Sequence, residues 1–307
     1  MPVPRHNSTR VPVQPARFLA ENACATLRKG FSPPAVGPML VRMGTVKPTF
    51  IFLVLAIGIL GEAAAATNRG TVLIYTRNGP GYVHSNIAAS TAVLRELARE
   101  GQFTVEVSED PAGFTDANLK RFRVLVFNNT NNEGFTDEEQ RAAFQRYIRG
   151  GGGFVGIHSA TGSERQWPWF HAMIGGKFRR HPPLQPFTIR VLDRQHPSTA
   201  FLGETWEWED ECYFVDHINP AIRVLLAADL TTLKDAQRNT YPDRIFGDLF
   251  PLAWYQYFEG GRQWYTALGH KAEHYRDLRF RRHLLAGILW AMGEEAAATA
   301  LASPGNN

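Results

Sequence analysis

Short, nearly uninterrupted apolar runs recur in the first half of the chain, and most are followed by a segment with helical spacing. Residues 71–76 (TVLIYT), 124–127 (VLVF) and 154–157 (FVGI) are aliphatic and β-branched, which is typical of strands buried on both faces. Residues 103–107 alternate and predict a further strand, and residues 85–100 carry an apolar face that predicts a helix.

The order of these elements predicts the fold class. A capping box from Thr136 to Glu139 begins a second helix, and the glycine run at 150–153 ends it. The resulting order is strand, helix, strand, strand, helix, strand. It indicates an α/β fold with three layers, α/β/α, in which helices cover both faces of a mostly parallel, doubly wound sheet.

Beyond residue 166 the pattern changes to alternating strands and clustered aromatic residues. Strands are predicted over residues 187–192, 206–215 and 224–226, a hairpin over 251–268 with its turn at 259–261, and a last helix over 276–292. No linker interrupts residues 67–295, so a single domain is predicted there. Residues 296–307 are small and polar and are expected to fray.

The first 66 residues differ from the rest of the chain. Residues 43–66 combine a basic start, the apolar run FIFLVLAIGIL and a small-residue A-x-A site, which predicts a signal peptide and a secreted or periplasmic protein. The apolar run is shorter than the ~20 residues that span a bilayer, although a short membrane anchor remains an alternative. Residues 1–42 are interpreted as a disordered leader, or as a mis-assigned segment before a true start at Met39 or Met43.

Charge and cysteine content exclude several classes of function. The 307-residue chain has a formal net charge of +4, but the first 66 residues hold seven Lys or Arg and two Asp or Glu, so the remainder is near −1. The basic character therefore gives no support to nucleic-acid binding, and no membrane contact is expected after signal removal. Cys212 is the only cysteine beyond the leader, which excludes an intramolecular disulfide there.

The most informative motif lies where the fourth apolar run ends. Gly156-Ile-His158-Ser-Ala160 resembles a nucleophile elbow, in which a sharp turn lifts one residue out of the sheet toward a crevice. Here that residue is His158, which can be a base, a nucleophile or a metal ligand but cannot form the thioester of glutamine hydrolysis. The alternative is that His158 only hydrogen-bonds a neighbouring loop.

Further imidazoles and carboxylates are candidates for the same site. His84 ends the loop after the first strand and His270 follows the hairpin, so both are expected to open into the crevice, although His84 could equally cap its own helix. With His158 and Glu211 they form the predicted catalytic set. Four further histidines are expected to be structural (His171, His196) or to face solvent (His274, His283).

Imidazoles together with carboxylates suit Zn²⁺, Mn²⁺ or Fe²⁺. The predicted metal ligands are His158, His181, His270 and Glu209, although no tight ligand motif is present. Strand alternation would put Glu207, Glu209 and Glu211 on one face and Asp210 on the other. The alternative is that these groups make ordinary hydrogen bonds and ion pairs, with no cofactor.

Residues for substrate contact are predicted from the loops at the carboxyl ends of the strands, which should line one crevice. Tyr82 and Asn129 lie in such loops, and His181 lies in a rigid Arg-His-Pro-Pro turn. Trp167 and Trp169 follow the elbow and could stack on the C–H face of a sugar, although any single aromatic residue is as readily a core residue.

Taken together, several segments make residues 70–292 resemble the ThuA-like (trehalose utilisation) family. The segments that carry the resemblance are VLIYTRNGPGYVH, NNTNNEGFT, GGGFVGIHSAT, GKFRRHPP, HPSTAFLGETWEWEDECYFV and GRQWYTALGH. The resemblance implies a class I glutamine-amidotransferase-like fold with flavodoxin-like layering, and members typically carry histidine at the elbow. It also implies a connection to disaccharides, notably trehalose and keto-sugars formed by oxidation at C3.

Two functions follow as hypotheses. The first is an exported enzyme acting on sugars or oxidised disaccharides or glycosides through a histidine-centred, metal-assisted acid/base site, without glutaminase activity. The second is a non-catalytic carbohydrate-binding or accessory module. In both, the partner is a small carbohydrate, and a homo-oligomer is left open.

Overall fold

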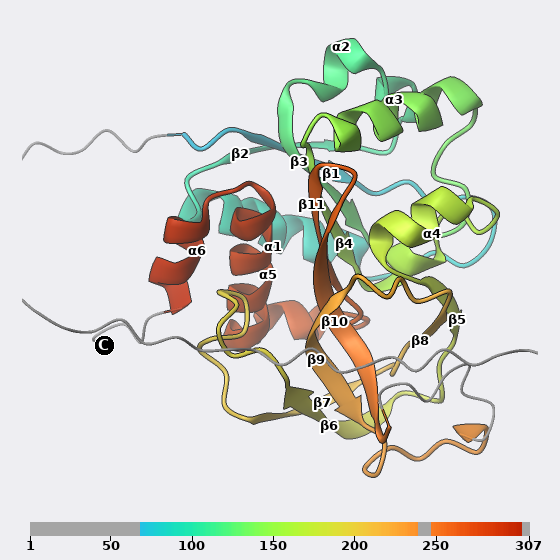
Figure 1. Ribbon diagram of the computed structural model, residues 1–307, viewed down its shortest axis with the longest axis vertical. Coiled ribbons are helices and arrows are strands. Elements are labelled where there is room, and N and C mark those ends of the chain that lie inside the picture. Colours follow the sequence, from blue (N-terminus) through green and yellow to red (C-terminus); the bar gives the residue numbers. More distant parts are fainter. Residues whose placement is uncertain (1–67, 239–246, 303–307) are drawn as a thin grey trace, which may run out of the picture. The chain divides into compact units, whose positions relative to one another are not determined.

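The computed structural model describes residues 68–238 and 247–302 (Figure 1). The predicted leader and signal peptide, residues 1–66, lie outside the described residues. The strands are β1 Thr71–Tyr75, β2 Thr104–Ser108, β3 Phe122–Asn128, β4 Gly153–Ile157, β5 Lys177–Arg180, β6 Gln185–Val191, β7 Thr205–Asp210, β8 Phe214–Asp216, β9 Arg223–Asp229, β10 Leu249–Phe258 and β11 Gly261–Thr266. The α-helices are α1 Ile87–Glu100, α2 Asp116–Leu119, α3 Glu138–Arg149, α4 Pro168–Ile174, α5 Leu278–Ala291 and α6 Glu295–Ala302.

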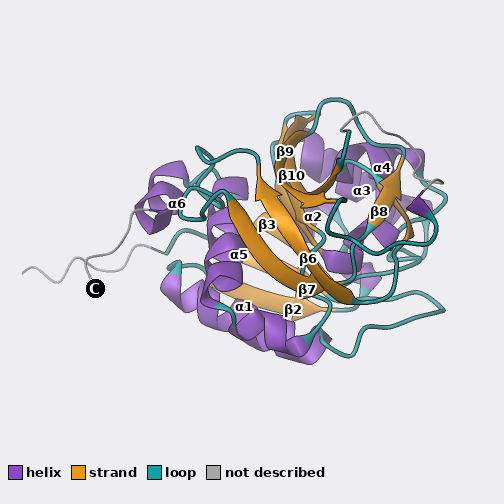
Figure 2. Ribbon diagram, turned by 90° about the horizontal axis from the view of Figure 1, so that it is seen from below, coloured by secondary structure: helices purple, strands orange, loops and turns teal. Residues whose placement is uncertain are grey.

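Nine of the described strands form one sheet in the order β2-β1-β3-β4-β11-β10-β9-β6-β7. The ladders from β2 to β11 are parallel, and those from β11 to β7 are antiparallel. It follows that β10 and β6 run against the other seven strands, so the sheet is mostly parallel. Helices α1 and α5 lie on one face and α3 and α4 on the other (Figure 2). The predicted α/β class with flavodoxin-like layering is therefore confirmed.

The start of α3 differs by one residue from the predicted capping box. Asp137, not Thr136, is the N-cap, and its Oδ1 accepts a hydrogen bond from the Gln140 backbone N–H at 2.9 Å. The Gln140 side chain returns the interaction by accepting from the Thr136 backbone N–H at 2.8 Å. These two reciprocal hydrogen bonds resemble those of a capping box, but Asp137 and Gln140 provide the side chains.

Close packing of α5 on the sheet depends on a glycine. A Cβ atom at Gly287 would lie 2.5 Å from the indole of Trp264 on β11, so only glycine lets the helix approach the fully buried ring. This contact fixes the strand that leads to His270.

The predicted frayed tail, residues 296–307, is wrong over its first part. Residues Glu295–Ala302 form α6, and Ala298 is fully buried. The alanine-rich segment has high helix propensity and packs on α5, which outweighs its terminal position. Residues 303–307 lie outside the described residues.

Candidate functional site

The elbow positions His158 at the carboxyl end of β4. Its backbone adopts the left-handed conformation, with φ of +51°, immediately after the buried strand. The Tyr265 hydroxyl donates to the His158 carbonyl at 2.7 Å and holds this turn. A non-glycine residue with positive φ carries some strain, which is characteristic of functional turns.

Three further side chains converge on the His158 imidazole. His84 comes from the loop between β1 and α1, His270 from the loop after β11, and Glu211 from the segment after β7. One potential ligand atom from each of the four residues lies within 4.8 Å of all the others. We call these four residues the histidine cluster. The sequence predicted all four as catalytic, and the structure places them together.

Hydrogen bonds determine the tautomer of His158. Its Nδ1 lies 2.8 Å from the Ala267 carbonyl oxygen, which can only accept, so Nδ1 carries the proton. Its Nε2 therefore presents a lone pair to the cluster, 3.1 Å from His84 Nε2. The Tyr213 hydroxyl lies 3.0 Å from the same nitrogen and is positioned to donate to it. A backbone carbonyl that orients an imidazole in this way is typical of metal-ligating histidines.

Burial keeps two of the imidazoles neutral. Desolvation, reinforced by the charge of His270, lowers the pKa of His84 to about 4. Desolvation, together with His84, lowers the pKa of the fully buried His158 well below its usual value. Both rings thus present lone pairs at neutral pH, the form in which histidine binds a metal.

His270 and Glu211 form a charge-assisted pair. His270 Nδ1 lies 3.2 Å from Glu211 Oε2, and this hydrogen bond raises the pKa of His270 despite its partial burial. Burial works to raise the pKa of Glu211, but the hydrogen bond with His270 and the charges of the nearby imidazoles outweigh it and lower the pKa. The carboxylate is thus ionised at neutral pH.

The buried carboxylate of Asp210 stabilises the two segments that carry Glu211 and His270. Asp210 accepts hydrogen bonds from the backbone N–H groups of Glu211, at 2.8 Å, and Gly269, at 2.9 Å. Glu211 belongs to the cluster and Gly269 directly precedes His270. Asp210 therefore joins the segment after β7 to the loop that carries His270. Its Oδ2 also lies 3.3 Å from His274 Nδ1, and His274 is buried, contrary to its predicted solvent exposure.

A cavity of about 360 Å³ opens beside the cluster. Its wall includes Tyr82, His84, Asn131, Arg165, His181, Glu211 and Tyr213. His158 is fully buried behind this wall, so a molecule in the cavity meets His84 and Glu211 first. His181 Nε2 lies 3.5 Å from Glu211 Oε1, which brings this predicted metal ligand to the edge of the cluster.

The structure places other predicted residues elsewhere. Glu209 points away, and its exposed carboxylate pairs with Lys271. Asn129 is fully buried beneath the site, where it bonds Asn86 and Tyr275. Trp167 and Trp169 stack on each other and contact Phe144, a residue of α3 in the core, so they lie outside the cavity wall. Of the predicted substrate contacts, Tyr82 and His181 line the cavity.

Tyr213, Arg165 and Asn131 line the cavity but were not among the predicted site residues. Tyr213 could have been found, since it lies two residues beyond Glu211 in the same aromatic, acidic segment. Its hydroxyl is buried, and desolvation with the nearby Glu211 charge raises its pKa well above 10, so it remains a donor.

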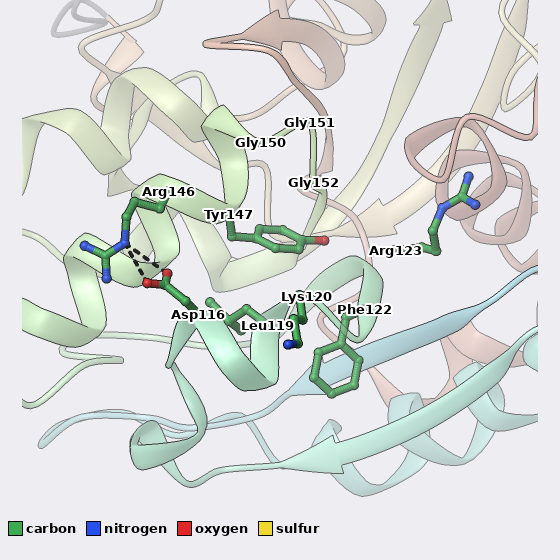
Figure 3. A pocket seen from close by; sticks show the side chains of 10 residues that line it. All are labelled: Asp116, Leu119, Lys120, Phe122, Arg123, Arg146, Tyr147, Gly150, Gly151 and Gly152. Atoms are coloured by element: carbon green, nitrogen blue, oxygen red, sulfur yellow. Dashed lines mark hydrogen bonds and ion pairs between the residues drawn. The ribbon is translucent and has the colours of Figure 1, made fainter.

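A different cavity, of about 430 Å³, lies at the amino ends of β3 and β4 (Figure 3). Its arginines are already engaged: Arg146 pairs with Asp116 and Glu139, and Arg123 donates to the Met292 carbonyl. None of the predicted site residues lines it. We therefore place the candidate functional site at the carboxyl ends of the strands, beside the histidine cluster, and not at this cavity.

The donor set fits a divalent transition metal. Three imidazoles and one carboxylate suit Zn²⁺, Mn²⁺ or Fe²⁺, and the fixed His158 tautomer supplies a lone pair rather than a proton.

Fold and site together define a flavodoxin-like α/β protein with a histidine cluster at its strand ends. The family model described as ThuA, trehalose utilisation, matches residues 71–291, and the chain belongs to this family. Similar solved structures include a putative ThuA-like protein from Bacteroides uniformis, 24% identical, with a TM-score of 0.59, covering 74% of this chain and 93% of that one. One from Parabacteroides merdae is 22% identical, with a TM-score of 0.56, covering 73% and 90%.

No curated protein matches the chain. The family description supports a carbohydrate-related role. Over the part of the chain that the structure describes, no helix combines the length and hydropathy needed to span a membrane.

Proposed function

We propose that this protein acts on a sugar or an oxidised, keto-containing disaccharide or glycoside by moving a proton beside the sugar carbonyl. The observation that carries the proposal is the convergence of His84, His158, His270 and Glu211 beside an open cavity. The trehalose-utilisation family supports the sugar as substrate class.

Each residue of the site has a distinct task in this proposal. The histidine cluster holds a divalent cation, which when bound supplies Lewis-acid stabilisation of negative charge on a substrate oxygen. His158, which no substrate reaches, fixes the cluster through its bond to the Ala267 carbonyl. His181 donates from Nδ1 to the Pro182 carbonyl at 2.8 Å, so its Nε2 lone pair is free to accept a proton in the cavity. The Tyr213 hydroxyl has one proton; with a cation on His158 Nε2 it would no longer donate to that nitrogen and could donate to a substrate oxygen instead.

Glutaminase activity is not part of this proposal, because the elbow carries an imidazole in place of a thiol. Cys212 does not substitute for it. Its side chain is fully buried, and desolvation raises the pKa of its thiol, so the thiolate nucleophile is disfavoured. Incubation with glutamine should release no ammonia; release at an enzymatic rate would contradict this part of the proposal.

The test uses exchange of the proton next to the carbonyl. The full-chain protein, loaded with Mn²⁺ or Zn²⁺, is incubated in D₂O with a keto-disaccharide and, separately, with trehalose, and deuterium incorporation and products are followed by NMR. His158→Asn is the informative variant, because asparagine tolerates the left-handed backbone of the elbow. His283→Asn is the matched control, since His283 is an equally buried imidazole outside the cluster.

We expect exchange with the keto-sugar in the wild type and the control, and a loss of at least 100-fold in His158→Asn. Equal rates in His158→Asn and wild type would refute the role of the cluster. Saturable sugar binding without exchange or product would instead favour the accessory-module function.

We also propose export to the periplasm or beyond, on the basis of the signal-like residues 43–66. Cell fractionation and N-terminal sequencing test it. A mature N-terminus near residue 67 is expected, and an intact chain recovered from the cytoplasm would contradict it.

A further inference from the structure

A third cavity, of about 480 Å³, lies beside α4 and the loop after β8. Its wall carries Arg165, His171, Lys177, His217, Gln166 and Asn219. Arg165 also lines the cavity of the histidine cluster, so this one residue borders both cavities. We call this third cavity the basic cavity.

No carboxylate lines the basic cavity among the described residues. The Arg165 guanidinium donates to the side-chain oxygens of Asn131 and Asn132, each at 3.1 Å, and forms no ion pair within the described part of the chain. The carboxylates of Glu133, Glu138 and Glu164 line a different cavity that Arg165 also borders. Lys177 forms no ion pair with a carboxylate within the described part of the chain. Asp216, the ladder partner of Lys177, lies 3.2 Å from the Arg179 guanidinium and 3.8 Å from the His217 ring, and it is not part of the cavity wall.

An unpartnered nitrogen on the wall is an independent indication of a ligand. His171 is 6% exposed, and its Nε2 has no hydrogen-bond partner. Its other ring nitrogen, Nδ1, donates to the Glu164 backbone carbonyl, so Nε2 presents a lone pair that can accept from a ligand hydroxyl but not from an oxyanion. An unpaired buried polar atom destabilises the folded protein, and a saccharide hydroxyl that donates to Nε2 would remove that penalty. The His217 ring, 69% exposed, stacks on His171 with centroids 6.3 Å apart.

We propose that the basic cavity binds the oxyanion of an acidic saccharide, a carboxylate or phosphate group, while the sugar extends past Arg165 toward the histidine cluster. The saccharide part of this inference rests on the proposed function. Charge-assisted hydrogen bonds to an oxyanion are about twice as strong as neutral ones, so the cations on a wall without carboxylates favour an anionic ligand over a neutral sugar.

Calorimetric titration of the full-chain protein tests the proposal with three probes: glucuronate, inorganic phosphate and glucose. Lys177→Gln removes one cation of the cavity without creating a core defect, because Lys177 is only partly buried. Arg190→Gln, at an exposed position on β6 that does not line the basic cavity, is the control for the same loss of charge. NMR of the His171 ring in the wild type reports whether the ligand occupies this cavity.

Glucuronate should bind at least tenfold more tightly than glucose and phosphate, shift the His171 resonances, and lose about tenfold in affinity in Lys177→Gln but not in Arg190→Gln. Equal affinity for glucuronate and glucose, or equal loss in both variants, would overturn the site. Phosphate binding as tight as glucuronate would overturn the saccharide assignment.

The two proposals can fail separately, because binding is measured without turnover. A protein that binds glucuronate in this way but exchanges no substrate proton would refute the proposed reaction alone. Exchange that depends on His158, without selective binding of glucuronate, would refute the basic cavity alone.

Discussion

The pair formed by Glu211 and His270 has a matched counterpart two residues away on the same strand end. Glu211 bonds His270, and Glu209 bonds the next residue, Lys271. The inner pair is partly buried, with side chains 13% and 21% exposed, while the outer pair is 53% and 35% exposed. Glu211→Gln and Glu209→Gln are therefore the same chemical change in two environments.

We expect Glu211→Gln to lower the free energy of unfolding by about 1–2 kcal/mol. A hydrogen bond between charged groups contributes about 1.5–3 kcal/mol, and partial exposure places this pair toward the weaker, surface-like end. For a domain of this size the loss corresponds to a decrease in Tm of about 2–8 °C. Glu209→Gln should have little effect, because its pair is exposed to solvent.

The effect of Glu211→Gln depends on pH in a defined direction. The raised pKa of His270 means that its contribution is complete below about 6.5 and is lost as the pH rises through the raised value. The lowered pKa of Glu211 means that its contribution is complete above its usual value of 4.5 and is lost as the pH falls through the lowered value. The variant should therefore differ most from wild type between about pH 4.5 and 6.5.

Urea unfolding at pH 5.5 and pH 9, with a chelator present to remove cation binding, measures this difference. The gap between wild type and Glu211→Gln should shrink at pH 9. If the gap is the same at both pH values, or if Glu209→Gln is equally destabilised at pH 5.5, the assigned charge pair is wrong.

Three further outcomes are expected. Tyr213→Phe should slow proton exchange tenfold or more while costing about 1 kcal/mol of stability, because one neutral hydrogen bond to His158 is lost; unchanged exchange would remove Tyr213 from the mechanism. Glu164→Ala should cost roughly 3 kcal/mol in urea unfolding, since Arg141 and the two backbone N–H groups of the preceding loop lose their buried acceptor; a cost below 1 kcal/mol would contradict the burial. The pKa of His283, lowered by desolvation to about 3, implies that stability falls as the pH drops below 6.5, and His283→Asn should reduce that slope by up to about 1.4 kcal/mol per pH unit; an unchanged slope would show that this ring is not buried in its neutral form.

Among the site residues, those that follow strands were the easiest to identify from the sequence. His158, His84 and His270 each follow an apolar strand, and parallel strands deliver their carboxyl ends to one edge of the sheet. The predicted strand ends therefore led to the expectation that these imidazoles share one crevice, with helix capping left open for His84, although they are far apart along the chain.

Carboxylates and tryptophans were harder to predict, for local reasons. Strand alternation predicted that Glu209 and Glu211 lie on one face. However, β7 ends at Asp210, whose carboxylate accepts a hydrogen bond from the Glu211 backbone N–H. Alternation therefore does not extend to Glu211. Trp167 and Trp169 flank Pro168, the first residue of α4, and the helix carries them onto α3. Neither the end of a strand nor the direction of a short helix is encoded in side-chain periodicity.

The carboxylate of the cluster comes from the far edge of the sheet, and this has a consequence for assembly. A chain that emerges from its N-terminus completes β1, β3 and β4 early and can bring His84 and His158 together. Glu211 and His270 follow β7 and β11 in the chain, and in the folded domain Asp210 joins their segments through the Gly269 backbone N–H. Any molecule that requires all four groups would recognise the finished domain and no shorter precursor, and its binding would stabilise the entire sheet against unfolding.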